Sequence, residues 1–564
     1  MKRWIFREGR YAPSAPLMER VLAARGFADA QAQKEHLEPE FGALYSPLLF
    51  KQMSPAVARI LRAREQAERV AIIGDYDADG ITASALLFRL FRALDMPAPL
   101  IYLPHRLYDG YGLTPNLVTR AYQDGANLII TVDTGITGVE AAALARDKGI
   151  DLIITDHHQV IGEIPLCLAL IDPWLPGETY PFKELSGVGV AYKLAAAVLA
   201  QVLPAAEAER FLKWSFDLTA LGTIADLVPL VGENRVFARL GLKVLERPQA
   251  PGLQALLRVA RVTSLDAETV SFRLAPRINA AGRVADPQLA LDLLIEEDEE
   301  KCMYLARELD RLNSERQSLV SAAMREIDKS VPMRNHKERL IIVKSSSWQH
   351  GIVGLIAGKL TERSLLPVIA MSNNHDPEVY VASCRSRPGY NVTEFIDHFR
   401  DMFLRGGGHA AAGGFSIGRD RLALFEESAH SWASEHWRET DPAEYMPLDI
   451  DCGISGTECT YTNALELQRL APFGIGNPEP VFSMSGAQVE NVRILGEQRQ
   501  HRQMRVRAPD QSSLDTITFN IGADAQTFRQ GEIVSFAGAL RANTFGGQKR
   551  AQLVLLDLRK GVMG

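Results

Sequence analysis

The sequence predicts an α/β protein with two sheet-containing domains, joined by a long connector helix and followed by an all-β barrel. Short apolar runs alternate with helix-length segments between residues 70 and 175, which indicates βαβ units and a parallel sheet. A second βα pattern begins at residue 340, and short alternating strands follow residue 445. A chain of 564 residues is also too long for a single core.

The first domain should contain five strands, at residues 70–74, 99–103, 128–132, 151–155 and 167–171. Acidic residues follow several of these runs, as at Asp75, Asp133 and Asp156. Ligands of parallel sheets bind beyond the carboxyl ends of the strands. We therefore expect the acidic residues to lie at the binding edge of this sheet.

The predicted domains are a lead-in or cap at 1–50, a first α/β domain at 51–285, a connector helix at 286–330, a second α/β domain at 331–445 and the barrel at 446–564. The connector is predicted because apolar residues recur there at spacings of three and four. The second α/β pattern ends in what reads as a glycine-rich loop, RGGGHAAAGGF, at residues 405–415.

The composition is that of a soluble globular protein, with 46% hydrophobic and 23% charged residues. The five cysteines form no CxxC pair, which argues against a zinc site or a disulfide framework. The N-terminus lacks the apolar core of a secretory signal, and no apolar run reaches membrane-spanning length, so a cytoplasmic protein is expected. The net charge of −7 does not by itself suggest a nucleic-acid binder, although it can hide a local basic channel.

Three aspartates, Asp75, Asp77 and Asp79, follow the first strand at alternate positions. If this stretch stays extended, they point to one side, where their mutual repulsion would be costly without a cation. The imidazoles of His157 and His158 lie beyond another strand end. Oxygen-rich ligation with one or two imidazoles suits Mn²⁺ or Mg²⁺ rather than zinc.

Each of these sites, taken alone, also has an ordinary structural explanation. Residues 75–79 could form a solvated acidic turn or a helix cap, and Asp133 could cap a helix. Residues 156–158 could be a surface loop, and Asp226 could be a cap or a buried hydrogen-bonding residue. Their joint occurrence at or near strand ends favours a metal centre.

The motifs GDYDADG (74–80), TVDTG (131–135), TDHH (155–158) and the aspartate of ADLVP (225–229) resemble those of the DHH phosphoesterase superfamily. Seven longer blocks are similar to the bacterial RecJ family of single-strand-specific DNA exonucleases. They are PHRLYDGYGLT (104–114), PFKELSGVGVAYKL (181–194), LGTIADLVPLVGENR (221–235), APRINAAGRVADP (275–287), LNSERQ (312–317), GGGHAAAGGF (406–415) and PFGIGNPEPVF (472–482). The resemblance covers residues 70–564 and implies a DHH domain, a DHH-associated domain and an OB-like barrel.

The resemblance also implies two bound ions, Mn²⁺ or Mg²⁺. The implied metal ligands are Asp75, Asp77, Asp79, Asp133, His157 and Asp226. Asp133 would bridge the ions and act in catalysis, and His158 would be a catalytic residue near the scissile phosphate. One position departs from the superfamily: Ile73 stands where pyrophosphatases have a histidine ligand, so Asp75 would fill that place.

The substrate-binding residues implied by the resemblance are Arg106, Tyr111, Arg277, Asn279, Ser383, Arg385 and His409. Salt bridges for the arginines and packing for Tyr111 and the glycine-rich segment are the alternatives. In WQHG, Gln349 takes the place that relatives give to a histidine, and His350 follows it. Basic residues with an aromatic in the barrel fit a single-strand track; they are Arg499, His501, Arg502, Arg505, Arg507, Arg541, Phe545, Lys549 and Arg550.

The expected function is therefore a metal-dependent 5′-to-3′ exonuclease on single-stranded DNA that releases 5′-mononucleotides. Through the family it would serve recombination and repair beside a single-strand-binding protein and a RecQ-type helicase, as a monomer. One alternative is a phosphodiesterase for cyclic dinucleotides or very short RNA, which would need neither the barrel nor the connector. Another is a non-catalytic DNA-binding scaffold, against which the full set of candidate metal ligands argues.

Overall fold

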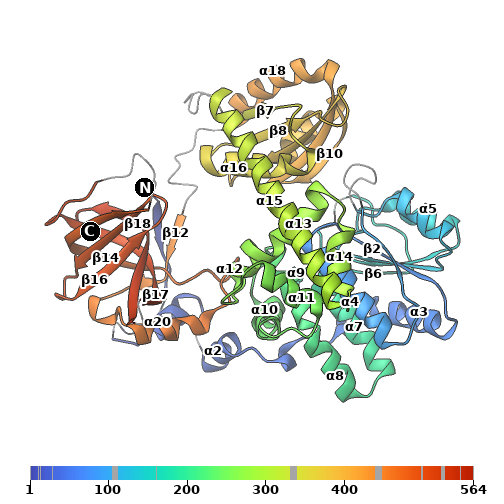
Figure 1. Ribbon diagram of the computed structural model, residues 1–564, viewed down its shortest axis with the longest axis horizontal. Helices are drawn as coiled ribbons and strands as arrows, with labels where there is room; N and C mark the ends of the chain where they lie inside the picture. Colours follow the sequence, from blue (N-terminus) through green and yellow to red (C-terminus); the bar gives the residue numbers. More distant parts are fainter. Residues whose placement is uncertain are drawn as a thin grey trace. The chain divides into compact units, whose positions relative to one another are not determined.

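The computed structural model describes residues 2–562 except 10, 11, 13, 28, 105–111, 161, 331–338, 438–446, 497–498, 522–526 and 546–547 (Figure 1). The chain forms two compact units. One unit contains residues 1–39, 440–473 and 477–564, and the other contains residues 40–439 and 474–476. Within the described ranges, no helix has both the length and the apolar character that crossing a membrane requires.

The larger unit contains the predicted parallel sheet, with strand order β3-β2-β4-β5-β6. Its strands are β2 (Val70–Gly74), β3 (Leu100–Tyr102), β4 (Leu128–Val132), β5 (Asp151–Thr155) and β6 (Ala169–Ile171). Every neighbouring pair is parallel. The prediction of a parallel-sheet α/β domain is therefore confirmed, and the carboxyl ends of the strands meet at one edge.

Helices cover both faces of this sheet, because successive side chains of a buried strand point to opposite faces. Ile72 packs in the core with helices α4 and α7, whereas Ile73 packs in the core with α5 and α6. These helices are α4 (Ala78–Ala93), α5 (Pro115–Gln123), α6 (Val139–Asp147) and α7 (Gly187–Val202). Ile73 is fully buried and serves packing.

Further helices carry the chain from the sheet to the connector. They are α8 (Ala205–Trp214), α9 (Phe216–Ala225), α10 (Gly232–Leu245), α11 (Pro251–Val259) and α13 (Ala275–Val284), with α3 (Met53–Glu65) preceding the sheet. The helical turn η3 (Val270–Leu274) leads directly into α13. Helix α13 packs against the connector helix, α15.

The prediction of a single connector helix over residues 286–330 is wrong in one respect. This segment forms two helices, α14 (Gln288–Ile295) and α15 (Glu299–Ser330). The break is held by acidic side chains. Glu296 accepts hydrogen bonds from the backbone N–H groups of Glu297 and Asp298, at 2.9 and 3.0 Å. Asp298 in turn accepts from Lys301 N–H at 2.9 Å, which starts α15.

The second α/β domain of this unit has a mixed sheet with order β10-β11-β9-β8-β7. Its elements are β7 (Ile341–Lys344), α16 (His350–Ser364), β8 (Val368–Ser372), β9 (Val379–Arg385), α17 (Val392–His398), β10 (Phe403–His409), β11 (Ala412–Gly418) and α18 (Arg419–His436). Strands β7 and β8 are parallel, and the other pairs are antiparallel.

The glycine-rich segment predicted as a loop is instead the hairpin of β10 and β11. Its two strands approach so closely that a Cβ on Gly408 would lie 2.4 Å from the Cα of Gly413. Glycine is normally depleted in strands, so local propensity hid this hairpin. Contact with the paired backbone explains the glycine at position 408.

The smaller unit contains the predicted barrel, and this prediction is confirmed. Its strands are β14 (Phe482–Leu495), β15 (His501–Arg507), β16 (Ser513–Thr518), β17 (Ile533–Phe545) and β18 (Gln548–Lys560). Strand β14 pairs with both β15 and β17, which closes the barrel. Helix α20 (Tyr461–Leu467) precedes these strands.

Residues 1–39, expected to belong to a separate lead-in, are part of the barrel unit. Strand β1 (Arg3–Phe6) pairs in parallel with β12 (Pro447–Ile450). Helices α1 (Leu17–Ala24) and α2 (Ala30–Leu37) follow, and Leu22 is buried in the barrel core. The boundaries drawn at residues 51, 286, 331 and 446 remain predictions.

Candidate metal centre and strand-binding residues

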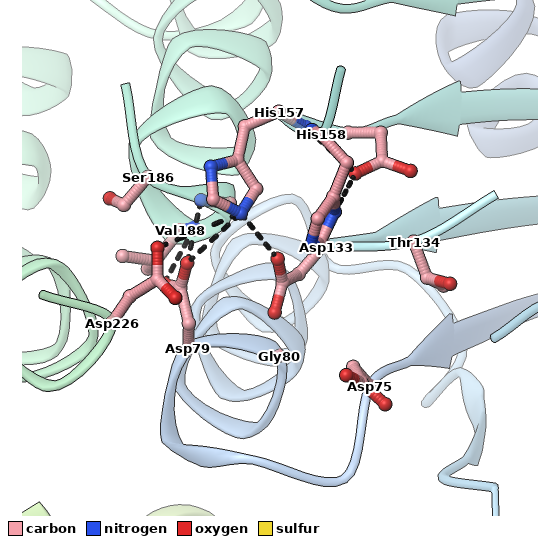
Figure 2. Close-up of polar contacts among 12 residues, drawn as sticks. Asp75, Asp79, Gly80, Asp133, Thr134, His157, His158, Ser186, Val188 and Asp226 are labelled. Carbon is pink, nitrogen blue, oxygen red and sulfur yellow. Dashed lines mark hydrogen bonds and ion pairs between the residues drawn. The ribbon is translucent and has the colours of Figure 1, made fainter. Parts of the chain in front are cut away.

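The predicted metal ligands gather at the carboxyl edge of the parallel sheet. Asp75 directly follows β2, Asp133 directly follows β4 and His157 follows β5, while α4 and the end of α9 supply Asp79 and Asp226. Figure 2 shows these side chains around one space. His157 Nε2 lies 3.0 Å from Asp133 Oδ1, 3.7 Å from Asp226 Oδ2 and 4.0 Å from Asp79 Oδ2.

The donor atoms form two adjacent groups. Asp75, Asp77 and Asp133 can bring one ligand atom each to within 4.8 Å of one another, and a second group unites Asp79, His157 and Asp226 within the same limit. A further grouping of Asp133, His157 and His158 overlaps both. Asp133 thus belongs to the first group and lies 3.0 Å from His157 of the second, and its role as a carboxylate shared by two ions stays a prediction.

The backbone at Asp133 is held in an uncommon conformation. Its φ of 60° is in the left-handed region, which non-glycine residues rarely adopt. The side chain of Thr131 donates a hydrogen bond to Thr134 O at 2.6 Å and fixes this turn. Gly187 leaves room for the carboxylate, since a Cβ there would lie 2.5 Å from Asp133 Oδ1. Backbone strain of this kind is concentrated at functional sites.

Two helix N-termini orient the first motif. Asp77 caps α4, because its Oδ1 accepts from the N–H groups of Asp79 and Gly80 at 3.0 and 3.2 Å. The carboxylate of Asp79 accepts from Gly187 N–H at 2.7 Å and Val188 N–H at 3.0 Å, at the start of α7. The sequence analysis missed this role of Gly187 and Val188, for which the SGVG stretch was the available signal.

The clustered carboxyl groups of the centre would be stabilised by a bound cation. Burial, and then the charge of Asp77, raises the pKa of Asp79 from 3.8 to about 7. Burial and neighbouring carboxylates raise the pKa values of Asp133 and Asp226 well above their ordinary value. Among the described residues, Asp133 Oδ1 and His157 Nε2 are buried without a hydrogen-bond partner. Such a set of oxygen donors with one imidazole fits Mn²⁺ or Mg²⁺.

The two histidines differ in charge. Burial, and then the charge of His158, lowers the pKa of His157 to about 4, so its ring is neutral and suited to a metal. Burial also opposes charge on His158, but its hydrogen bond to Asp156 and the charge of Asp156 raise its pKa to about 9. The His158 Nδ1 to Asp156 Oδ1 distance is 2.7 Å. A cationic His158 therefore stands beside the metal centre.

Three predicted substrate-binding residues lie together on the second sheet. Arg385 of β9 is paired across from Ala412 of β11, which is itself paired with His409 of β10. Arg385 Nη1 donates to Ser383 Oγ at 3.0 Å. Burial, followed by the charges of Arg385 and His158, lowers the pKa of His409.

Two other predicted contacts have protein partners. Arg277 forms an ion pair with Asp310 of α15 at 2.7 Å and donates to Arg273 O at 2.5 Å. Asn279 Oδ1 accepts from Ala78 N–H at 2.7 Å, beside the metal ligands. Arg106 and Tyr111 lie outside the described residues.

The WQHG stretch at residues 348–351 packs in the second domain. Trp348 is buried, and its Nε1 donates to Glu326 of α15 at 3.0 Å. Gln349 immediately precedes α16, and His350 is the first residue of that helix. Among the described residues, neither Gln349 nor His350 belongs to a candidate metal-binding group.

The basic residues predicted to bind a strand on the barrel differ in their surroundings. Arg505, Lys549 and Arg550 line a cavity of about 370 Å³ together with Tyr461. Several of the predicted basic residues have partners within the barrel unit: Arg505 pairs with Asp515 at 3.2 Å, Arg507 with Glu490 at 2.6 Å and Arg541 with Glu479 at 2.6 Å, and the Arg502 guanidinium lies 4.9 Å from the ring of Phe528. Arg499 and His501 lie before and at the start of β15, and the side chain of Phe545 is outside the described residues.

Family models match the three parts of the chain that carry these features. The N-terminal domain of the DHH family matches residues 69–223, the DHHA1 domain residues 337–435 and the RecJ OB domain residues 450–557. These matches, the parallel sheet and the acidic centre at its edge define a metal-dependent phosphoesterase of the DHH class.

Relatives specify the family further. The single-stranded-DNA-specific exonuclease RecJ of Bacillus subtilis is 36% identical over 544 residues, covering 96% of this chain and 68% of that protein. Its Escherichia coli counterpart is 32% identical over 562 residues, covering 96% and 95%. The crystal structure of Thermus thermophilus RecJ with Mn²⁺ has a TM-score of 0.83 at 28% identity, covering 100% of this chain and 80% of that chain. A second structure of that protein contains Mg²⁺ and has a TM-score of 0.77 at 27% identity, covering 100% and 79%. The chain belongs to the RecJ family of single-stranded-DNA-specific exonucleases.

Proposed function

We propose that this protein is a single-stranded-DNA-specific 5′-to-3′ exonuclease that releases 5′-mononucleotides by two-metal-assisted hydrolysis of phosphodiester bonds. The observation that carries the proposal is the pair of adjacent donor groups that meet at Asp133, whose Oδ1 lies 3.0 Å from His157 Nε2. No serine or cysteine nucleophile is needed for this chemistry.

In this proposal Asp75, Asp77 and Asp133 would hold one ion, and Asp79, His157 and Asp226 would hold the other together with Asp133. When bound, two such cations orient the scissile phosphate and lower the pKa of a water toward neutrality. The protein keeps the donors in place: α7 fixes Asp79, and the turn after β4 fixes Asp133.

His158 is proposed to face the scissile phosphate as a cation. Its raised pKa keeps the ring protonated at neutral pH, and Asp156 fixes its orientation through Nδ1. A cation at this place would stabilise the negative charge that grows on the phosphate oxygens as the bond breaks. His157 has the opposite task, because its neutral ring can donate a lone pair to a metal.

The end of the strand is proposed to bind at Ser383, Arg385 and His409 on the second sheet. A guanidinium can hold a phosphate through two parallel hydrogen bonds, and the neighbouring serine hydroxyl supports that geometry. For Arg277 the ion pair with Asp310 would have to be shared or exchanged when DNA binds. Roles for Arg106 and Tyr111 rest on the family resemblance alone.

The remaining parts of the proposal concern the cellular setting. The barrel would guide the strand through basic residues such as Lys549 and Arg550, which line a cavity with Tyr461. The protein would act in the cytoplasm, as a monomer, in recombination and repair. A single-strand-binding protein and a RecQ-type helicase would be its partners, since an exonuclease for single strands needs an opened duplex as its substrate.

The test is an incubation with Mn²⁺ and a 3′-labelled single-stranded oligonucleotide, beside its duplex, an RNA copy and a cyclic dinucleotide. Progressive shortening of the single DNA strand alone, abolished by EDTA, is the expected result. Cleavage of the dinucleotide with an intact strand would make the protein a small-ligand phosphodiesterase. Binding of DNA without any cleavage would make it a scaffold.

A further inference from the structure

Helix α13 reaches the metal-binding loop although it lies far from it in sequence. Asn279 Oδ1 accepts a hydrogen bond of 2.7 Å from the backbone N–H of Ala78, 201 residues earlier in the chain. Ala78 is the first residue of α4 and stands between Asp77 and Asp79. It is only 1% exposed, so water cannot easily replace this hydrogen bond.

Asn279 completes the cap of α4. The first four N–H groups of a helix have no partner within the helix. Here Asp77 Oδ1 accepts from the N–H groups of Asp79 and Gly80, whereas the N–H of Ile81 makes the first hydrogen bond within the helix, to Asp77 O at 2.9 Å. The N–H of Ala78 is a third group without a partner in the helix, and Asn279 accepts its hydrogen bond from outside the motif. The start of α4, which Asp77 caps, therefore also depends on a side chain of α13.

A second contact lies one turn further along α13. A Cβ on Gly282 would be 2.8 Å from the backbone oxygen of Tyr76, so only glycine allows this approach without a shift. Asn279 and Gly282 together contact both ends of the tripeptide 76–78. The loop between Asp75 and Asp79 thus rests on one face of α13.

Helix α13 is itself held by other parts of its unit. Arg277 pairs with Asp310 of α15 at 2.7 Å. At the other end, Arg283 Nη1 donates to Gly351 O of α16 at 3.4 Å, and a Cβ on Gly351 would meet Arg283 O at 1.8 Å. Helix α13, which contacts the loop between Asp75 and Asp79, is therefore held in place by the connector helix and by the second domain.

We propose that Asn279 is a positioning residue for the metal centre, which fixes Asp77 and Asp79 through Ala78, and that it is not a contact of the DNA strand. Loss of its acceptor leaves a buried N–H unsatisfied between two metal ligands and loosens both. The inference rests on the proposed function only for the identity of the ion, since positioning is a property of the folded protein.

The test compares Asn279→Leu, which removes the acceptor at similar volume, with Asn279→Asp, which keeps an acceptor oxygen. Ile278→Val is the matched control, because Ile278 is fully buried on the same helix and its truncation costs stability while Asn279 keeps its acceptor oxygen. Mn²⁺ affinity is measured by calorimetry and by the free-ion electron paramagnetic resonance signal. Affinity for a single-stranded oligonucleotide is measured by fluorescence anisotropy in EDTA.

Asn279→Leu should weaken Mn²⁺ binding by about tenfold or more, as changes to the partners of metal ligands commonly do. Its oligonucleotide affinity in EDTA should be unchanged, and its activity should recover as Mn²⁺ is raised. Asn279→Asp and Ile278→Val should keep Mn²⁺ affinity. Should Asn279→Leu not fold, Gly282→Ala disturbs the same loop from its other end and should also weaken Mn²⁺ binding.

Unchanged Mn²⁺ affinity with a loss of oligonucleotide affinity in Asn279→Leu would overturn the inference and make Asn279 a strand contact. Unchanged Mn²⁺ affinity in a folded Gly282→Ala variant would count against it as well. Mn²⁺ affinity and oligonucleotide affinity are both measured without turnover, so they do not depend on the outcome of the exonuclease assay. If Mn²⁺ affinity depends on Asn279 as expected but the protein cleaves no DNA, only the proposed function is refuted.

Discussion

Asp133 Oδ1 and His157 Nε2 lie 3.0 Å apart, and neither atom has a hydrogen-bond partner among the described residues. Both side chains are almost fully buried, with 3% and 10% exposure. Buried polar atoms are nearly always partnered in folded proteins. A carboxylate and a neutral imidazole left facing each other are therefore explained by a cation that both would bind.

Replacement of Asp133 by alanine removes the carboxylate shared by the two donor groups. We expect the rate of strand shortening in Mn²⁺ to fall by roughly 10³-fold or more. Single-strand affinity in EDTA should be nearly unchanged, because the barrel and the second sheet are untouched. Asp147→Ala is the matched control, since Asp147 ends α6 with a side chain that is 71% exposed. Normal turnover by Asp133→Ala would refute the metal assignment.

The stability of the metal-free protein should fall as pH rises toward neutrality. Burial and Asp77 raise the folded-state pKa of Asp79 from 3.8 to about 7. The folded state then binds the proton more tightly than the unfolded state, and this contribution is complete below 3.8 and lost as pH rises through about 7. The pKa values of Asp133 and Asp226 are raised in the same direction.

Mn²⁺ should offset this loss, so the increase in Tm that it causes should grow with pH over the same window. Thermal unfolding with EDTA and with Mn²⁺, at a series of pH values, measures the effect. Asp79→Asn should flatten the pH dependence of the EDTA curve. An Mn²⁺-induced shift that does not change with pH would mean that these carboxyl groups are not the ligands.

Gly187→Ala should damage the centre through contact alone. The new Cβ would lie 2.5 Å from Asp133 Oδ1, so the carboxylate or the start of α7 must move. We expect weaker Mn²⁺ binding and a stability loss of about 1–3 kcal/mol. The control is Gly358→Ala in α16, where nothing lies within 4 Å of the new Cβ. That change should stabilise the helix by roughly 0.5–1 kcal/mol and leave Mn²⁺ binding as it was.

Lys549→Ala and Arg550→Ala should weaken single-strand binding if the barrel guides the strand. Each lost phosphate contact should reduce the slope of log affinity against log salt by about 0.7. Arg507→Ala serves as the control, since Arg507 pairs with Glu490 at 2.6 Å and does not line the cavity that contains Lys549 and Arg550. Anisotropy titrations at several salt concentrations measure the slopes. Equal slopes for all three variants and the unmodified protein would remove the barrel from the proposed track.

Much of the metal centre could be predicted because its signals are local. A buried strand followed by an acidic residue needs no distant partner to be recognised, and parallel strands bring their carboxyl ends to one edge. Asp75 and Asp133 follow directly from that rule, and His157 nearly so. The barrel was equally readable from short alternating strands, which the structure closes through β14 and β17.

Other features depend on which segments pack together. The hairpin at residues 403–418 was hidden because glycine is a poor strand former until a close neighbouring backbone requires it. The division of the connector at Glu296 depended on side-chain hydrogen bonds that a spacing pattern does not reveal. Residues 1–39 read as a separate lead-in because the core that they join is more than four hundred residues away in sequence.

The sequence by itself therefore determined the strands of the parallel sheet, the presence of the barrel and the acidic and histidine side chains that follow the strand ends, since local sequence patterns indicate each of them. The tertiary structure alone decided what those side chains touch. Arg277 and Asn279 stand two positions apart in one motif, yet one pairs with Asp310 and the other accepts from Ala78. Successive positions on a helix point in different directions, and only the packing of α13 between α4 and α15 determines their partners.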